Sequence, residues 1–525
     1  MQKSFSLPSV MSHDFSRSPK VNIQRSQIDR SSGYKSTFDA GFLIPFFWDE
    51  VLPGDTFNIK ATLFARLATP IYPIMDNLYL DTHWFFCPER LLWENWKRFC
   101  GEQDDPSDSI DFVMPVQTPP SAGYAEGSLG DYLGIPIDIA DTPDVRAGIF
   151  RMYNRTYNEW FRDENLQDSV VVDRDDGPDL DTDYTLLKRG KRHDYFTSCL
   201  PWPQKGDQVT LPIGTSAPIE RVDNGAGVKV YEAGTNTLQT SGNVDVTGAG
   251  FLDGTSSTIL SLDPNGSLQA DLTAAAGATI NDLIQSFAIQ DLLVRDARGG
   301  TRYTELLQSH FGVTSPDSRL QRVEYLGGSS KPISFYSVPN TTDAGTAPQG
   351  ALSAYATGNI NNEGFVKSFT EHGLIMGLVS LRADLNYQQG LERKWSRSTR
   401  YDFYWPSLAN LGEQAVLNKE IYLQGTSADD DVFGYQERWA EYRYKPSLIT
   451  GALRSAAATP LDAWHVAQDF GSLPTLNSTF IEENPPIDRI IAVPSEPHII
   501  FDSYIKAICA RPMPLYSVPS LANHF

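Results

Sequence analysis

The chain has 525 residues, of which 41% are hydrophobic, and its formal net charge is −22. This length exceeds what one hydrophobic core usually fills, so we expect several packed units or one unit with large insertions. The composition excludes a disordered or collagen-like chain. The acidity excludes a protein that grips nucleic acid with its whole surface, because such a surface repels phosphate at long range.

Residues 1–36 differ from the rest of the chain in charge. They hold six basic and two acidic side chains, which gives a local charge of +4. Two interpretations stay open for this segment. It is either a disordered terminus or a basic arm that orders against a neighbouring subunit or packaged nucleic acid.

From residue 37 onward, period-two patterns predict β-strands. Apolar and polar residues alternate over 56–63 and continue on one face over 78–86, with Pro70 and Pro73 in the turn between them. This first part of the main domain is expected to span residues 37–204.

Two helices are predicted in the middle of the chain. Apolar residues at helical spacing predict a helix over 142–162, with Thr142 as N-cap and Pro143 at the first helical position. A second helix is predicted from Thr279 to the glycine pair that begins at Gly299.

An acidic loop, residues 168–183, comes shortly after the first predicted helix. Its aspartates leave two interpretations open. One is a Ca²⁺ site, although the spacing does not match an EF-hand, and the other is a solvated loop.

Residues 205–280 have an unusual composition. Gly, Ser, Thr and Ala supply 36 of the 76 positions, and the only aromatic residues are Tyr231 and Phe251. So little bulky apolar material cannot form a large core, so we expect a variable insertion on the surface.

Strand patterns return over 372–388 and over 498–509, within a second part of the main domain at residues 281–525. Strands near both ends of the chain, with helices and long loops between them, predict one β-sandwich closed by distant segments.

Motifs for catalysis are missing from the sequence. It contains no P-loop, HExxH or GxSxG motif, and no histidine has a second ligand at metal spacing. His465, beside Trp464, is more typical of a packed core residue than of a catalyst. We therefore expect no enzymatic activity, no cofactor and no metal. The four cysteines form no disulfide framework, and neither a signal peptide nor an apolar membrane-spanning run is present, so membrane insertion is not expected.

Three segments mix basic and aromatic residues, at 188–193, 391–405 and 438–445. Aromatic rings stack on unpaired bases while Arg and Lys hold phosphates, so this mixture suits single-stranded nucleic acid. The alternative is a core or inter-subunit contact in which arginines stack on aromatics and pair with neighbouring carboxylates such as Glu392, Asp402, Glu437 or Glu441. The candidate nucleic-acid-binding residues are Lys188, Arg189, Lys191, Arg192, Arg393, Lys394, Trp395, Arg397 and Arg400.

Several long blocks of sequence resemble one protein family. The blocks include STFDAGFLIPFFWDEVLPGDTF (36–57), LATPIYPIMDNLYLDTHWFFCPERLLW (67–93), ARGGTRYTELLQSHFGVTSPDSRLQRVEYLGG (297–328), SFTEHGLIMGLVSLRADLNYQQGLERKWSRSTRYDFYWP (368–406) and ARPMPLYSVPSLANHF (510–525). They resemble the major capsid protein of small single-stranded DNA bacteriophages of the microvirus family, in its gokushovirus branch. Val323 and Ser520 stand where the family pattern has Pro and Gly, and neither difference affects a functional assignment.

The resemblance implies a fold and a role. The expected fold is a mainly β viral jelly-roll, an eight-stranded antiparallel β-sandwich with long inserted loops that contain helices. The chain would assemble, in about 60 copies, into a T=1 icosahedral shell around circular single-stranded DNA. Assembly would take place in the cytoplasm of the bacterial host, and the product would be the virion.

The resemblance also implies partners. These are further copies of the chain, the packaged DNA, a small basic DNA-associated protein, a minor pilot or spike protein and a receptor on the bacterial surface. The insertion at 205–280 would form a protrusion at the three-fold axes, with Tyr231 and Phe251 as candidate host-contact residues.

Two other classes of protein match parts of the sequence. A carbohydrate-binding or carbohydrate-active β-protein would suit acidic surfaces and exposed aromatics, but it needs carboxylates facing each other across a cleft. Glu482–Glu483 and Asp429–Asp431 are only neighbours in sequence. A soluble receptor-binding spike would not explain the basic N-terminal segment.

Overall fold

The computed structural model describes residues 24–209, 280–342, 345 and 348–516, together with six short strands between residues 219 and 270. These residues divide into two compact units. One runs to Pro203 and resumes at Gly299, and the other is Gln204–Arg298.

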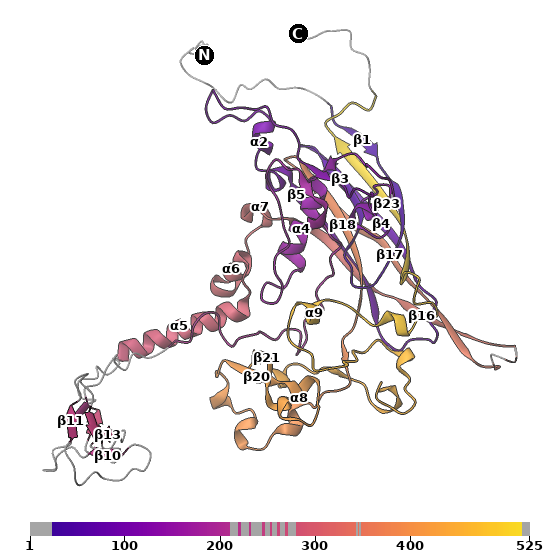
Figure 1. The fold of residues 1–525 in the computed structure, drawn as a ribbon. Helices are drawn as coiled ribbons and strands as arrows, with labels where there is room; N and C mark the ends of the chain where they lie inside the picture. The colour runs from indigo at the N-terminus through magenta and orange to yellow at the C-terminus, as the bar shows by residue number, and fades with distance from the viewer. Residues whose placement is uncertain are drawn as a thin grey trace, which may run out of the picture. The chain divides into compact units, whose positions relative to one another are not determined.

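The larger unit is built on two antiparallel sheets (Figure 1). The first sheet contains, in spatial order, β2 (Ser32–Phe38), β23 (Ile499–Arg511), β4 (Thr56–Leu67) and β17 (Leu352–Ser368). The second contains β3 (Ile44–Val51), β18 (Gly373–Ala383), β5 (Leu78–Pro88) and β15 (Glu324–Pro332). Numbered one to eight along the chain, the strands lie in the orders 1-8-3-6 and 2-7-4-5. This interleaving is that of a jelly-roll, so the predicted fold class is confirmed.

The two sheets enclose the main hydrophobic core. Every second residue of β4, from Phe57 to Leu67, is buried, and the residues between them face outward. Strand β23 alternates in the same way from Ile499 to Cys509. The strands predicted over 56–63 and 498–509 are therefore confirmed.

Strand β18 is buried at every position. Ile375 and Val379 enter the core between the sheets, while Leu374 and Met376 enter a second core behind the second sheet. The strand expected within 372–388 is present, and its two faces serve two different cores.

Helix α4 (Gly148–Thr156), extended by one π-helical turn (Tyr157–Phe161), supplies much of the second core. The predicted helix over 142–162 begins too early, because Val145–Arg146 forms strand β7, which pairs with β6 (Val116–Thr118). The Thr142 hydroxyl donates to the carbonyl of Ile139 and does not cap the helix. Here tertiary strand pairing outweighs a local capping signal.

The acidic loop 168–183 is mostly exposed, in line with the solvated-loop interpretation, but two of its aspartates are bound to side chains of the fold. Arg151 of α4 is fully buried, and its Nε lies 2.8 Å from a carboxylate oxygen of Asp179. Asp176 accepts a 2.7 Å hydrogen bond from the indole N–H of Trp93. Across the described ranges, no group of three or more acidic, His or Cys side chains is placed to hold a metal ion.

Part of the segment predicted as an N-terminal arm belongs to the sheet. Strand β1 (Ser26–Asp29) and strand β2 both pair with β23. Arg30 and Lys35 form ion pairs with Asp49 and Asp502, at 2.9 and 2.8 Å. The remainder of the arm, residues 1–23, lies outside the described residues.

The smaller unit contains the predicted insertion. Three two-stranded sheets lie in it, β9 (Ile219–Arg221) with β14 (Leu268–Ala270), β10 (Val230–Glu232) with β13 (Leu260–Leu262), and β11 (Val244–Val246) with β12 (Leu252–Gly254). Helix α5 (Ile280–Gly299) follows and confirms the helix predicted from Thr279. Tyr231 lies in β10, and Phe251 lies outside the described residues.

Residues 195–199, together with the chain between β18 and β23, form a third core around Tyr195 and Ile421. Its elements include β19 (Asn386–Tyr387), β20 (Glu413–Leu417), α8 (Asn418–Ile421), β21 (Val432–Glu437), β22 (Ser447–Leu448) and α9 (Ser478–Ile481). The remaining elements are α1 (Glu89–Leu92), α2 (Trp96–Phe99), α3 (Leu129–Tyr132), β8 (Asp179–Leu180), α6 (Tyr303–Phe311), α7 (Asp317–Leu320) and β16 (Ser334–Pro339), the last paired with β17.

Candidate nucleic-acid interface

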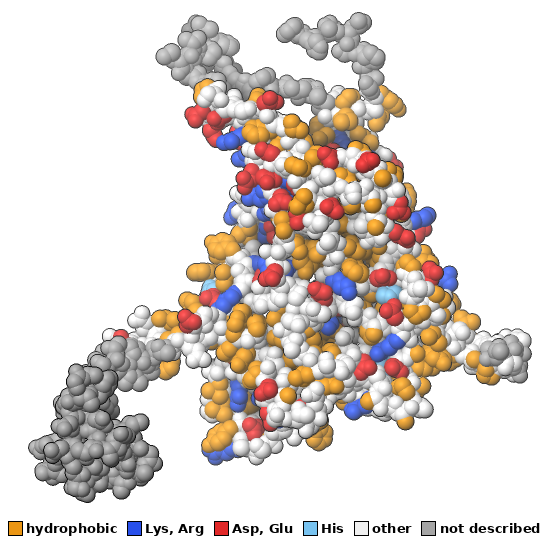
Figure 2. Space-filling model, in the orientation of Figure 1, with side chains coloured by type: hydrophobic (Ala, Val, Ile, Leu, Met, Phe, Trp, Pro, Cys, Tyr) orange, Lys and Arg blue, Asp and Glu red, His pale blue; other side chains and the backbone are white. Residues whose placement is uncertain are grey.

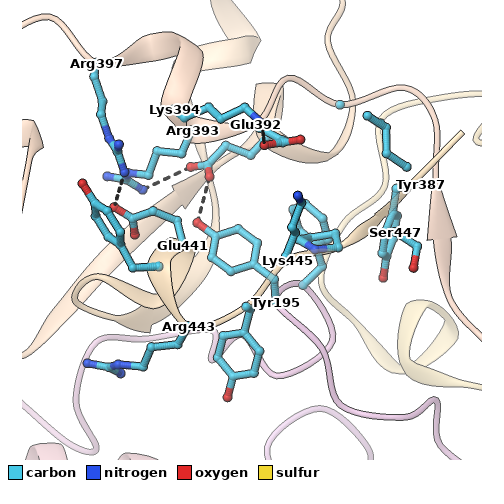
Figure 3. Close-up of a pocket in the computed structure, with 17 residues that line it drawn as sticks. Tyr195, Tyr387, Glu392, Arg393, Lys394, Arg397, Glu441, Arg443, Lys445 and Ser447 are labelled. Carbon is cyan, nitrogen blue, oxygen red and sulfur yellow. Dashed lines mark hydrogen bonds and ion pairs between the residues drawn. The ribbon is translucent and has the colours of Figure 1, made fainter. Parts of the chain in front are cut away.

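A cavity of about 360 Å³ lies on this third core and brings two of the predicted basic–aromatic segments together (Figure 3). Its walls include five cationic and three acidic side chains. These are Arg393, Lys394, Arg397, Arg443 and Lys445, with Glu392, Glu420 and Glu441. The site is therefore basic by count, but its charges are largely paired within the chain.

The deepest pair joins Arg393 to Glu420 of α8, with 3.1 Å between guanidinium and carboxylate. The other oxygen of Glu420 accepts a 2.8 Å hydrogen bond from the hydroxyl of Tyr195. Burial raises the pKa of Glu420, and the charge of Arg393 opposes that rise. Burial alone would lower the pKa of Arg393, but Glu420 and Tyr195 raise it by more. Because these groups are already bound to each other inside the chain, we assign the pair a structural role rather than a role in ligand binding.

The neighbouring cations are also partnered. Arg397 lies 3.5 Å from Glu441 and stacks over the ring of Tyr442 at 4.5 Å. Lys394 forms a close ion pair with Glu392. Figure 3 shows Arg397 pointing toward Glu441, and Lys394 lying beside Glu392.

Three of the basic residues in segment 188–193 also have partners within the chain. Arg189 lies 2.6 Å from the carboxylate of Asp81, which also binds Arg382. Lys191 is buried, donates to the carbonyl of Phe480 at 2.6 Å, and has its pKa lowered by burial. Lys188 donates to Asn484 at 2.8 Å.

Four of the nine predicted residues keep exposed side chains. They are Arg192, Lys394, Trp395 and Arg400. Trp395 is 72% exposed, and the Lys394 ammonium lies 5.7 Å from the centre of its ring. Arg400 lies over Tyr401 at 4.9 Å. These four side chains keep exposed surface, although Lys394 is paired with Glu392, and the other five are held by contacts inside the chain.

The comparison with known families matches the chain over residues 16–521 to the family described as "Capsid protein (F protein)", whose family model is named Phage_F. The chain belongs to this phage capsid protein family. The resemblance deduced from the sequence is confirmed, and the jelly-roll gives it a structural basis.

Three curated relatives are each named "Capsid protein VP1". The protein of Bdellovibrio phage phiMH2K is 48% identical, with 98% of each chain covered. That of Chlamydia phage 1 is 43% identical over 99% of this chain and 100% of its own. That of Spiroplasma virus 4 is 37% identical over the same shares. The chain is therefore a capsid protein, a structural component of the virion, and its family is not one of enzymes.

The carboxylates considered for a carbohydrate-active site have structural roles in this capsid protein. Glu483 is buried and accepts from the backbone N–H of Ala383 at 3.0 Å. Asp429 accepts from the backbone N–H groups of residues 424–426 at the start of a short helical turn. The charged side chains on the face in Figure 2 are interspersed in sign. No described helix combines the length and apolar character that crossing a bilayer requires.

Sequence reasoning did not single out Arg443 and Lys445 individually, although both line the cavity. The signal was present in the basic–aromatic segment 438–445. Arg443 forms a close ion pair with Glu437, whereas Lys445 is exposed and has no ion pair with a described residue.

Proposed function

We propose that the chain forms, in about 60 copies, an icosahedral shell that encloses circular single-stranded DNA. The jelly-roll strand order, in a chain matched to a phage capsid family over nearly its whole length, carries the proposal. Closed point-group symmetry lets one kind of subunit build a shell from repeated contacts.

The charge of the chain requires cations inside such a shell. A subunit of net charge −22 cannot neutralise packaged DNA by itself. We infer that a small basic virion protein accompanies the DNA, and that the subunit contributes local basic contacts.

For the predicted basic–aromatic segments, we propose that the exposed members are the DNA contacts. Arg192, Lys394, Trp395 and Arg400 reach solvent, whereas removing the half-buried Arg393 would leave the buried carboxylate of Glu420 without its cation. A variant carrying Lys394→Ala and Arg400→Ala should therefore reduce packaged DNA without preventing assembly.

Electron microscopy of the expressed chain, alone and with the other virion components, tests the shell. Regular icosahedral particles that contain nuclease-protected single-stranded DNA are expected. A stable monomer under all conditions, or particles without DNA in the complete system, would refute the proposal.

We propose a second role, host attachment, for residues 205–280. The support is compositional, since Gly, Ser, Thr and Ala dominate, and Tyr231 and Phe251 are the only large aromatic side chains there. Deleting the insertion should leave shells that assemble but neither adsorb to the host nor infect it. Tyr231→Ala with Phe251→Ala should weaken adsorption, and unchanged adsorption would remove the host receptor as a partner of this segment. A minor pilot or spike protein would then be the remaining source of attachment.

A further inference from the structure

The outward face of the first sheet is open. On β4 the residues that point away from the core are exposed from Asn58 to Arg66, and on β23 they are exposed from Ile500 to Lys506. The second sheet differs, because outward residues of its central strands β5 and β18, among them Phe85, Leu374 and Met376, are covered by the second core. The open face is therefore the one broad sheet surface of the described jelly-roll strands that lacks a cover.

Unpaired cations gather on this open face. Lys60 of β4 and Lys506 of β23 are directly opposite each other in the antiparallel register. Arg66 lies further along the same face of β4, about 20 Å from Lys60 at the usual strand rise. None of the three forms an ion pair with any described residue.

The neighbouring acidic groups are used elsewhere. The carboxylate of Asp29 is bound to the backbone N–H and hydroxyl of Ser31, and these bonds lower its pKa more than the charge of Lys506 does. On β17, a bulge places Gly364 opposite Lys60 and turns Glu363 toward the interior, where it accepts from Trp84 at 3.1 Å. The described part of the fold therefore supplies no ion-pair partner for the two lysines.

A like-charge pair of directly opposed residues destabilises a sheet by a few tenths of a kcal/mol, up to about 1 kcal/mol. Lys60 and Lys506 are thus not explained by the stability of the subunit. Where the same face does need an internal partner it has one, since Lys35 lies 2.8 Å from Asp502. Because Lys35 is paired on this face while Lys60, Lys506 and Arg66 are not, we infer that these three side chains bind an anion from outside the chain.

Exposed aromatic rings lie among these cations. Phe64 is next but one to Arg66 on the same face, and Tyr504 is next but one to Lys506. They are 43% and 57% exposed. Cations that hold a phosphate backbone, interleaved with rings on which bases stack, are the common design of surfaces that bind single strands without sequence preference.

We propose that the open face formed by β4 and β23 binds the packaged single-stranded DNA, with Lys60, Arg66 and Lys506 on phosphates and Phe64 and Tyr504 against bases. This inference rests on the proposed enclosure of DNA and adds the surface that meets it. A second copy of the chain is the alternative occupant. An acidic protein surface would neutralise the cations but would give the two exposed rings no bases to stack on.

Ultraviolet crosslinking of purified particles tests the placement directly in the wild-type chain. Trypsin cleavage after Lys60 and Arg66 releases peptide 61–66, which contains Phe64, and cleavage after Arg489 and Lys506 releases peptide 490–506, which contains Tyr504. Nucleotide adducts on these two peptides are expected. Adducts confined to other peptides would overturn the proposal.

A variant with Lys60→Gln and Lys506→Gln gives the second test, with Lys35→Gln as a control on the same face. The double variant should assemble with less DNA per subunit, and the control should match the wild type. For the unassembled full chain, the slope of log affinity for oligothymidylate against log salt should fall by about 1.4 when two phosphate contacts are lost. An unchanged DNA content and slope would overturn the proposal, as would a folded double variant that no longer assembles, because the face would then be a subunit contact.

The experiments distinguish the proposal that the shell encloses DNA from the proposal that the open face binds it. Wild-type particles without DNA would refute both. Wild-type particles with DNA, but without crosslinks at either peptide, would refute only the assignment to the open face. Should the double variant not fold, the crosslinking of the wild-type chain still decides.

Discussion

The cavity on the third core and the open face of the first sheet both combine basic and aromatic side chains. They differ in whether the basic side chains form ion pairs within the chain. In the cavity, Arg393 and Arg397 each meet a carboxylate of the same chain. On the open face, Lys60 and Lys506 lie opposite each other with no ion-pair partner among the described residues. A cluster of basic residues in the sequence is therefore a poor indicator of charge that is free for a ligand.

Burial is the physical reason for this difference. The loops that form the cavity fold back over a hydrophobic core, and a cation placed there must be paired to offset its lost hydration. A side chain on the open face of a sheet stays in water and needs no partner. Cations without a carboxylate partner can therefore persist on the sheet, whereas Arg393 beside Tyr195 is paired.

The largest expected effect comes from breaking a pair in the cavity. Glu420→Ala leaves Arg393 and the hydroxyl of Tyr195 without their acceptor, which should cost about 3 kcal/mol of unfolding free energy. Urea unfolding of the full chain measures it. The matched control is Glu392→Ala, which removes a half-exposed partner of Lys394 and should cost less than about 0.5 kcal/mol. Equal effects would mean that the two regions do not differ in this way.

A second effect concerns pH at His83, beside the Arg189–Asp81 pair. Burial and the charge of Arg189 lower the pKa of His83 to about 4. The unfolded chain therefore binds a proton that the folded chain does not between about pH 6.5 and pH 4, so stability falls as the pH falls through that window. Since His83 keeps some solvent contact, we expect a loss of about 2 kcal/mol relative to His83→Phe between pH 7 and pH 4.

The His83→Phe variant also defines the result that would contradict this expectation. The imidazole is surrounded by the rings of Phe85, Phe161 and Tyr325, so phenylalanine fits the site chemically. Parallel curves of unfolding free energy against pH for the two proteins would show that His83 is not buried as a neutral group.

A smaller effect is expected at the rim of the cavity. Lys394→Ala with Arg400→Ala should lower the DNA content of particles, but by less than the double substitution at Lys60 and Lys506. The reason is that Lys394 already forms an ion pair with Glu392, which weakens its attraction for phosphate. Absorbance ratios of purified particles compare the two variants. A larger loss at the rim would make the cavity, rather than the sheet, the main DNA contact.

The smallest effect is expected at Lys35. Its ion pair with Asp502 is exposed on both sides, so Lys35→Ala should change the unfolding free energy by less than about 0.5 kcal/mol. DNA content should not change. A marked loss of DNA would mean that paired and unpaired cations of the open face act alike.

Much of the fold could be predicted from local patterns. The alternation from Phe57 to Leu63 predicts a strand with one buried face, because strand side chains alternate regardless of which strand lies beside them. The helix from Thr279 to Gly299 follows from helical spacing and a glycine stop. The family resemblance added the jelly-roll, which such patterns do not specify.

The tertiary structure decided which charges are free. Arg189 and Asp81 are 108 positions apart, and Tyr195 and Glu420 are 225 apart, so no local pattern pairs them. The same holds for Lys60 and Lys506, which become neighbours only when the last strand of the chain inserts between β2 and β4. Local sequence patterns were enough to predict the strands and helix α5, and the long matching blocks were enough to recognise the family. The roles of individual cations were decided by long-range strand pairing, because pairing sets both burial and the distance to a counter-charge.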